Sequence, residues 1–422
     1  MINRILSRIL FFSLFLTLSS CEWLKGPEEE KTANEYVYSI FREWYLWYDQ
    51  IPELDPNSYE NYDDLIASMK TSVDRWSIAA SLTKVRELFE QGEYKGFGCG
   101  LMIDFDNQIK VSHVFNASPL GLQGVQRGWI VKSVNGYTIE NIDGINGALN
   151  SDDVVQFVFV DLEGQTRTIS TSRQIFQMNT VMYSNVFVYN EKKIGYIVFH
   201  SFVETSLDEL RPVFESFSAQ GINELIVDLR YNGGGKNNVA ESLIGMIGGS
   251  KVKGKAIAGL VHNDKKAKLN NVSVSNYNGA AVNINRVYFI TSHSTASSSE
   301  LVINCLKPFM DVKLVGSKTT GKPVGMYIKE VEKLDLAVLP VCFKNVNAVG
   351  EGDYYDGFSP NIPQYDDITR NWGDPDELML QTALNDIRGQ VIAGTKSAAT
   401  SKAGQMRCLG EFKGINRIIN SY

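Results

Sequence analysis

The hydrophobic pattern is clearest between residues 193 and 316, where short apolar runs alternate with longer amphipathic stretches. The apolar runs have the length of buried strands and cover residues 194–200, 224–229, 287–291 and 312–316. The amphipathic stretches have helical spacing and cover residues 206–220, 238–247 and 298–306. Strands that alternate with helices in this order predict an α/β unit with a largely parallel sheet. Ligands of such sheets bind where the strands end, so the residues that follow each strand are the first candidates for chemistry.

Two different patterns precede this unit. Residues 31–93 carry aromatic side chains at three- and four-residue spacings and predict a small helical cap, in which the aromatic residues pack together. Residues 94–176 contain short alternating runs separated by glycine-rich turns and predict a β domain. The sequence therefore predicts a multi-domain α/β protein whose core spans residues 177–390. The lysine-rich residues 251–268 are interpreted as a solvated loop, with a border of the binding cleft as the alternative.

The N-terminus has the pattern of a secretion signal. Two arginines precede the apolar run 9–18, which is too short to span a membrane as a mature helix. The sequence Leu18-Ser19-Ser20-Cys21 resembles a bacterial lipobox, which implies cleavage before Cys21 and acylation of its thiol. An ordinary signal peptide with a chance cysteine is the alternative. We expect residues 1–20 to be removed, Cys21 to hold several acyl chains that anchor the protein stably, and residues 21–30 to form a flexible tether.

This anchor predicts a location in the bacterial cell envelope, as an outer-membrane lipoprotein. The acidic residues 28–30 resemble surface-export signals of Bacteroidota-type lipoproteins, and periplasmic and surface-exposed placement both stay open. In such an oxidising compartment the remaining cysteines lack the close CxxC pairing of a zinc site. We interpret Cys99, Cys305, Cys342 and Cys408 as small buried hydrophobic residues, with one disulfide as the alternative.

Composition and charge narrow the choice of partners. The 422-residue chain is 44% hydrophobic and 21% charged, values that are typical of a globular protein and exclude wholesale disorder. Its net charge of −7 gives no electrostatic reason to expect nucleic-acid binding. We expect protein or peptide partners, no metal and no cofactor. Residues 391–422 form a basic low-complexity stretch and predict a solvated tail.

The β domain contains a candidate peptide-binding turn. The sequence Gly96-Phe97-Gly98-Cys99-Gly100-Leu101 opens onto a strand, and residues 117–136 supply a small-residue turn, a second strand and an Asn-Gly pair. Together these stretches resemble a PDZ domain, although Trp129 stands where that family usually has aspartate. Backbone N–H groups freed by the glycines would bind a carboxylate while the strand edge pairs with an extended peptide. The predicted carboxylate-binding residues are Gly98, Cys99, Gly100 and Leu101; a β domain that only packs is the alternative.

Two turns in the α/β unit are candidates for chemistry. The strand at residues 225–229 ends in Arg230-Tyr231-Asn232-Gly233-Gly234-Gly235, just before a helix. Backbone N–H groups at a helix start can bind an anion, either a phosphate or the oxyanion of an acyl-transfer intermediate. No phosphate-loop motif is present, and a purely structural turn is a further alternative. The second turn, Thr295-Ala296-Ser297-Ser298-Ser299-Glu300, exposes one serine between a strand and a helix, and Gly321-Lys322-Pro323 follows it.

In this order, the motifs strongly resemble the C-terminal processing peptidases, also called tail-specific proteases, over residues 31–390. The resemblance includes Asp74-Arg75-Trp76-Ser77 in the helical cap and implies a crotonase-like α/β core. It implies that Ser297 is the nucleophile and Lys322 the general base, and that the N–H groups of Ser298 and of Gly233 or Gly234 bind the oxyanion. A lysine is a base only when it is neutral, so the pocket must lower its pKa by burial. Many members have a glutamine four residues after the lysine, where this chain has Met326.

The resemblance implies a membrane-tethered serine endopeptidase that binds substrate C-termini through a PDZ domain and hydrolyses peptide bonds with a Ser-Lys dyad. One rival is a catalytically impaired peptide-binding lipoprotein of the same fold, which Met326 motivates. Another is a hydratase-like fold that binds coenzyme A at the glycine-rich turn, which Lys236 alone supports. A histidine base is the remaining alternative, with His200 and His293 as its candidates, although both are interpreted as residues of the pocket wall or of strand ends.

Overall fold

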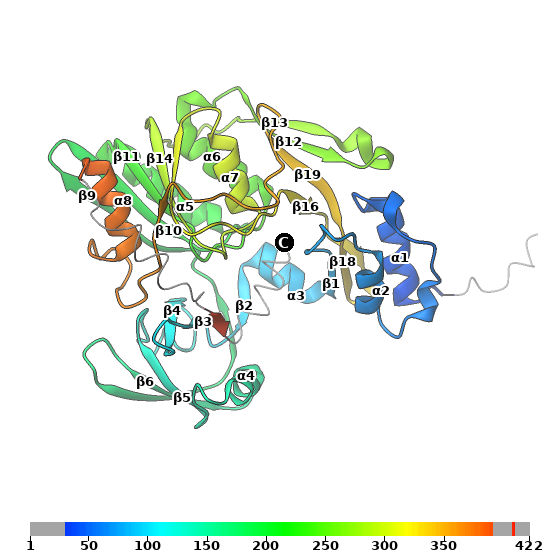
Figure 1. Cartoon of the computed structure of the whole chain (residues 1–422), viewed down its shortest axis with the longest axis horizontal. Coiled ribbons are helices and arrows are strands. Elements are labelled where there is room, and N and C mark those ends of the chain that lie inside the picture. Colours follow the sequence, from blue (N-terminus) through cyan, green and yellow to red (C-terminus); the bar gives the residue numbers. More distant parts are fainter. Residues whose placement is uncertain (1–29, 391–406, 410–422) are drawn as a thin grey trace, which may run out of the picture.

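A computed structural model describes residues 30–390 and 407–409 of the chain. The predicted signal, Cys21 and most of the tether and the tail lie outside the described residues. Within them the fold is mixed α/β and multi-domain with a helical N-terminal part, as predicted (Figure 1). No helix of the described part has the length and apolarity needed to cross a membrane.

The N-terminal part is built around two helices, α1 (Ala33–Trp44) and α2 (Tyr62–Met69). Thr32 and Glu35 form a capping box that starts α1, because each side chain accepts a hydrogen bond from the backbone N–H of the other. Short turns η1 (Tyr48–Gln50) and η2 (Pro56–Ser58) connect the two helices. The aromatic residues of the cap, Phe41 and Tyr45 among them, pack in one buried cluster, as predicted.

This part is not helical throughout, which corrects the prediction for residues 31–93. Strand β1 (Ile78–Ser81) pairs with β18 (Leu336–Leu339), and β18 pairs with β17 (Lys329–Val331). Helix α3 (Leu82–Arg86) and a short π-helix, η3 (Glu87–Gln91), follow β1. Four residues are too few for a periodic signal, and the partner strand lies far along the chain.

The β domain contains a sheet of order β21-β3-β4-β5-β6-β7 and one helix, α4 (Ile142–Asn150). The strand bounds are β3 (Cys99–Ile103), β4 (Ile109–Val114), β5 (Ile130–Val134), β6 (Val155–Val160), β7 (Thr166–Thr171) and β21 (Arg407–Leu409). A separate pair, β2 (Glu93–Gly96) and β8 (Gln174–Gln177), joins this domain to the rest of the chain. Its core is a buried cluster that includes Trp129, Phe157 and Phe159.

The core of the molecule is a six-stranded sheet of order β20-β15-β14-β11-β10-β9. All its pairs are parallel except β9–β10, so the predicted largely parallel sheet is confirmed. The strand bounds are β9 (Val181–Tyr189), β10 (Lys192–Phe199), β11 (Glu224–Asp228), β14 (Arg286–Thr291), β15 (Asp311–Gly316) and β20 (Ile362–Pro363). Its helices are α5 (Ser206–Gln220), α6 (Asn237–Gly248), α7 (Ser298–Leu306) and α8 (Leu378–Arg388).

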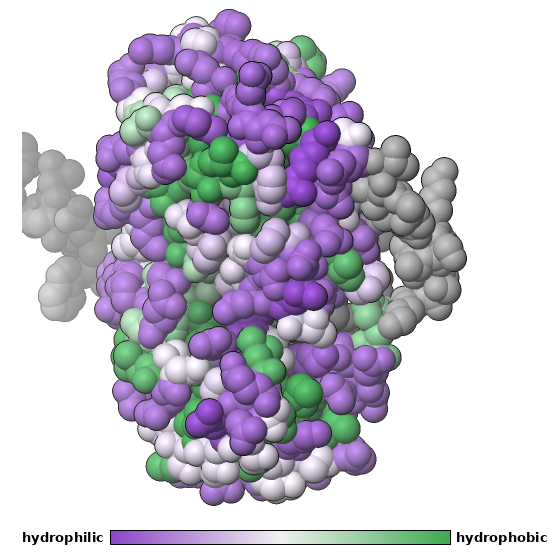
Figure 2. Space-filling view, turned by 90° about the vertical axis from the view of Figure 1, so that its left-hand side faces the viewer, coloured by the Kyte–Doolittle hydropathy of each residue, from purple (hydrophilic) through white to green (hydrophobic). Residues whose placement is uncertain are grey.

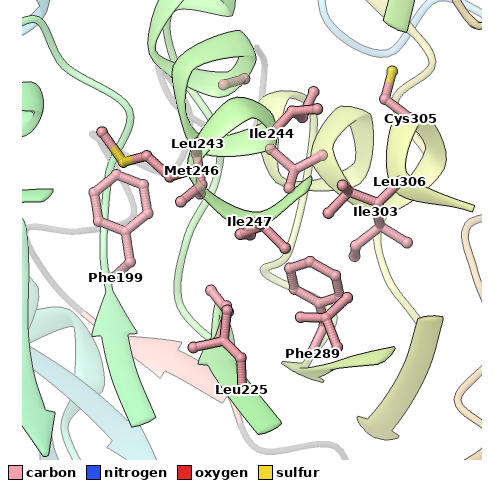
Figure 3. Packing of buried hydrophobic residues seen from close by; sticks show 14 of the residues in the cluster. Phe199, Leu225, Leu243, Ile244, Met246, Ile247, Phe289, Ile303, Cys305 and Leu306 are labelled. Carbon is pink, nitrogen blue, oxygen red and sulfur yellow. The ribbon is translucent and has the colours of Figure 1, made fainter. Parts of the chain in front are cut away.

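Helices α6 and α7 pack on one face of this sheet. Figure 3 shows side chains of both helices above Leu225 and Phe289 of the strands. Helix α8 covers the opposite face with Met379, Leu380 and Leu384. Burial on both faces explains why the sheet strands read as continuous apolar runs in the sequence.

A four-stranded sheet of order β13-β12-β19-β16 lies beside α7 and extends toward the helical part (Figure 1). Its strands are β12 (Ala256–His262), β13 (Asn271–Val274), β16 (Val324–Met326) and β19 (Val341–Asn347), and short turns η4 (Gly249–Lys251), η5 (Asp264–Leu269) and η6 (Glu332–Leu334) complete the fold. The prediction of a solvated loop at residues 251–268 is wrong, because β12 pairs with β19 there. The face shown in Figure 2 is mostly polar, with apolar groups in separate patches.

Candidate active site

Ser297 lies in the turn between β14 and the start of α7. Its backbone has φ 55° and ψ −117°, a left-handed conformation that is strained for a residue with a side chain. The residue is 8% exposed and immediately precedes a helix whose residues are all buried. The sharp turn therefore places one serine at the end of a sheet strand, where parallel sheets bind ligands.

Glu300 joins this turn to the segment that contains Lys322. Its Oε2 accepts hydrogen bonds from the backbone N–H of Ser297 (3.1 Å) and of Lys322 (2.7 Å). Its Oε1 accepts from the N–H of Gly321 (2.7 Å) and from the hydroxyl of Thr319 (2.5 Å). A single buried carboxylate thus holds the backbones of Ser297 and Lys322 next to each other.

The amine of Lys322 lies in a desolvated pocket. The residue is 1% exposed, and its Nζ donates to the Sδ of Met326 at 3.4 Å. Burial lowers the pKa of Lys322 well below its usual range, while the carboxylates of Asp74 and Glu300 act in the opposite direction. Met326 therefore occupies the place beside the amine and contributes a polarizable, weakly accepting wall.

Asp74 is a second charged group near this amine. Its Oδ1 accepts from the N–H groups of Trp76 (2.9 Å) and Ser77 (3.0 Å), and its Oδ2 is buried without a hydrogen-bond partner in the described residues. The negative charge of Asp74 raises the pKa of Lys322 from the level that burial alone would set. The helical cap thus contributes a carboxylate to the electrostatics of the core.

The glycine-rich turn after β11 lies against Ser297. A Cβ atom on Gly234 would come within 2.7 Å of the Cβ of Ser297 and 2.9 Å of the Ser298 nitrogen, so only glycine fits this contact. The N–H of Gly234 already donates to Oδ1 of Asn232 at 2.9 Å. No hydrogen bond among the described residues engages the N–H of Gly233. Of the two predicted glycines, Gly233 therefore has the N–H group that no described acceptor engages, and its assignment to an oxyanion stays a prediction.

Buried ion pairs support the glycine-rich turn after β11. Arg230, 1% exposed, donates to Asp228 (2.7 Å), Asp366 (2.7 Å) and Glu377 (2.7 Å). Arg127 of the β domain also donates to Asp366, at 2.7 Å. This network connects β11, the start of α8 and the β domain next to the glycine-rich turn.

The histidine candidates lie in different surroundings. The two ring nitrogens of His200 lie 2.8 Å from the Ser201 hydroxyl and 3.2 Å from Nε2 of His113. Burial lowers the pKa of His200 to about 4. His293 is exposed, and its carbonyl accepts from the Thr320 hydroxyl. His200 therefore belongs to a contact between the core and the β domain.

The predicted carboxylate-binding residues begin β3. Gly98 has φ +78° and its carbonyl accepts from the N–H of Phe115 at 2.9 Å, whereas Cys99, Gly100 and Leu101 belong to the strand. The turn thus leads directly into the strand. Binding of a carboxylate by this turn stays a prediction. Within residues 30–390, Cys99, Cys305 and Cys342 are all buried, as predicted. The described residues contain no cluster of three His, Cys, Asp or Glu side chains that could hold a metal.

Two residues of the site had no role in the sequence reasoning. Glu300 follows Ser297 by three residues, which is the spacing of a capping box and would have indicated it. Asp74 stood in a recognised motif, but its proximity to Lys322 has no sequence signal because the two are contributed by different parts of the fold.

Comparisons with known proteins match two regions of the chain to family models. Residues 193–361 match the model of peptidase family S41, and residues 32–78 match that of the peptidase S41 N-terminal domain. A protein named a probable CtpA-like serine protease from Staphylococcus epidermidis is 24% identical over 72% of this chain, and one from Staphylococcus aureus is 22% identical over 73%. The chain covers 60% of the length of each of these two relatives.

Among solved structures, a Bacteroides fragilis protein described as an S41 protease has a TM-score of 0.73 and 25% identity, over 86% of this chain and 99% of its own. The core that contains Ser297 and Lys322 and the helical part that contains Asp74 are thus the two regions that the family models match. The chain therefore contains the N-terminal domain and the peptidase domain of peptidase family S41.

Proposed function

We propose that the protein is a serine endopeptidase in which Ser297 is the nucleophile and Lys322 the general base. The observation that carries this proposal is the single Glu300 carboxylate that binds the backbones of both residues, beside a lysine whose pKa burial lowers. Neutral lysine can accept a proton at a pH where an exposed lysine cannot.

In the proposed reaction, Oγ of Ser297 attacks the carbonyl carbon of a peptide bond while Nζ of Lys322 takes the hydroxyl proton. The carbonyl oxygen becomes an oxyanion, which accepts hydrogen bonds from the N–H groups of Ser298 and Gly233. Collapse of the intermediate breaks the C–N bond, and the lysine ammonium returns the proton to the departing amine. Water then hydrolyses the acyl-enzyme with Lys322 again acting as the base.

Substrate recognition and location complete the proposal. The β domain acts as a PDZ domain, in which the turn at Gly98 binds the C-terminal carboxylate of a substrate and β3 pairs with its last residues. The lipid on Cys21 holds the enzyme at the cell envelope. The support for recognition is the glycine turn at the start of an extended strand, and the support for the anchor is the lipobox-like sequence.

The Met326 contact separates this proposal from the rival, a binding protein without turnover. A thioether excludes water from the amine and so preserves the depressed pKa that a base requires, although it orients the amine less firmly than an amide would. We therefore expect turnover with Met326 present. A Met326→Gln variant is expected to keep activity within about tenfold of the parent.

The test uses residues 22–422 and an unfolded polypeptide with an apolar C-terminus. Cleavage is compared for the parent, Ser297→Ala, Lys322→Ala and, as a matched control, Lys344→Ala, which removes a partly exposed lysine paired with Asp353. We expect losses of at least about 1,000-fold for the first two variants and an unchanged rate for the control. Equal cleavage by Lys322→Ala would remove lysine as the base, and binding without cleavage by the parent would favour the rival.

A further inference from the structure

The β3 edge of the β domain is paired with the chain's own C-terminal segment. In the sheet order β21-β3-β4-β5-β6-β7, strand β21 is the outermost of the described strands and pairs with β3. Without β21, β3 would present a row of unpaired N–H and C=O groups, which is a template for a further strand. Figure 1 shows β21 in red beside β3, at the lower part of the molecule.

The pairing has the geometry of strand addition by a peptide. It is antiparallel, with Arg407 opposite Ile103, Cys408 opposite Met102 and Leu409 opposite Leu101. Because β3 starts at the turn formed by Gly96–Gly98, the direction of β21 is toward that turn. A peptide that presents its C-terminal end to the turn while pairing with β3 would run in the same direction.

The occupied edge is the one that the proposed function assigns to substrate. Leu101 is one of the predicted peptide-contacting residues and is directly opposite Leu409. Every residue of β3 is buried in the structure. The other edge of β3 pairs with β4, so a substrate strand and β21 cannot both pair with the remaining edge at the same time.

We propose that Arg407–Leu409 is an intramolecular ligand of the β3 edge and that substrate C-termini must displace it. This inference rests on the proposed function, in which β3 takes the substrate strand. A three-residue pairing is weak in isolation, but a ligand within the same chain competes at an effective concentration that reaches the mM range. The measured affinity for substrate falls by the fraction of molecules whose edge is open, so the segment sets a threshold for substrate binding.

The experiment uses residues 22–422 with Ser297→Ala to prevent cleavage. Cys408→Pro disfavours β21, because proline cannot donate to a ladder, and Cys408→Val is the matched control with a residue that favours strands. A chain that ends at Gln390 removes the segment altogether. The probes are a labelled peptide with the sequence of residues 405–411, an unlabelled peptide with an apolar C-terminus, and hydrogen exchange of the amides of Cys99–Ile103.

We expect the labelled peptide to bind the shortened chain and Cys408→Pro at least tenfold more tightly than the parent and Cys408→Val. The amides of β3 should exchange faster in the first pair, and the added peptide should restore their protection. Equal affinities and equal exchange in all four proteins would overturn the proposal.

The unlabelled peptide separates this inference from the proposed function. If it displaces the labelled peptide from the shortened chain, the segment and substrate share one edge, as proposed. If the labelled peptide binds and protects β3 but the unlabelled peptide does not displace it, recognition of substrate C-termini by this edge is wrong and occupation of the edge by the segment still holds.

Discussion

Two buried basic residues of the core, Arg230 and Lys322, have pKa values that shift in opposite directions. Arg230 and Lys322 are each 1% exposed, and burial disfavours the charged form of both. Arg230 remains charged because Asp228, Asp366 and Glu377 surround it, and the pKa of its guanidinium is raised well above the usual value. The pKa of Lys322 falls, because the loss of solvation outweighs the opposing effect of the carboxylates of Asp74 and Glu300.

The position of the carboxylates explains this difference. Glu300 is close to Lys322 but directs its oxygens to the backbone N–H groups of Ser297, Gly321 and Lys322 and to the Thr319 hydroxyl. It therefore positions the lysine through the backbone. For Arg230 the surrounding carboxylates outweigh the cost of burial, whereas for Lys322 burial outweighs the carboxylates and favours the neutral amine.

The largest expected effect comes from breaking the compensated site. Arg230→Met leaves Asp228, Asp366 and Glu377 buried with one partner fewer, and we expect it to lower the free energy of unfolding by about 3–5 kcal/mol. The matched control is Arg286→Met, because Arg286 pairs with Glu224 but is 27% exposed and its loss should cost less than about 1 kcal/mol. Denaturant unfolding measures the free energy of unfolding of both variants. Equal decreases would contradict a larger stabilising role for the buried network.

A smaller effect of opposite sign on the free energy of unfolding is expected at Lys322. Lys322→Met should abolish cleavage and raise the free energy of unfolding at pH 7 by about 0.5–2 kcal/mol, because the parent must bury a neutral amine that is protonated in the unfolded chain. The unfolded state of the parent binds more protons, so its stability rises with pH between the lowered pKa of Lys322 and the ordinary lysine pKa. The gain from Lys322→Met should therefore shrink between pH 7 and pH 10 in thermal unfolding.

If Lys322→Met is instead less stable than the parent at pH 7, the lysine is charged in the folded protein and the comparison fails. Lys344→Met serves as the control, because this partly exposed lysine should change stability little at either pH.

The smallest expected effect concerns the pKa of Lys322, the proposed base. Asp74 raises the pKa of Lys322, so Asp74→Asn should lower that pKa further and shift the acid limb of the pH–rate profile to lower pH, by less than about one unit. Asparagine keeps an oxygen to accept from Trp76 and Ser77. Asp63→Asn, at an exposed position of α2, should leave the profile unchanged. A shift to higher pH would contradict the assigned electrostatics.

The sequence predicted the core well because its signals are local. The runs that form β10, β11, β14 and β15 are buried on both faces, and α7 begins at Ser298, the residue where its pattern begins. The strands β1, β12 and β16–β19 were not predicted, because short strands have little periodicity of their own and because β1 and β12 pair with segments far along the chain.

The sequence by itself determined the residue types of the candidate site, the order of the core strands and helices, and the family, because motif residues and periodicity are properties of neighbouring positions. Only the tertiary structure decided that Glu300 holds Ser297 beside Lys322, that Asn232 takes the N–H of Gly234, that Asp74 acts on the lysine and that β21 pairs with β3. Most of these contacts join segments that are far apart along the chain, and all of them depend on burial and hydrogen-bond geometry, which sequence spacing does not encode.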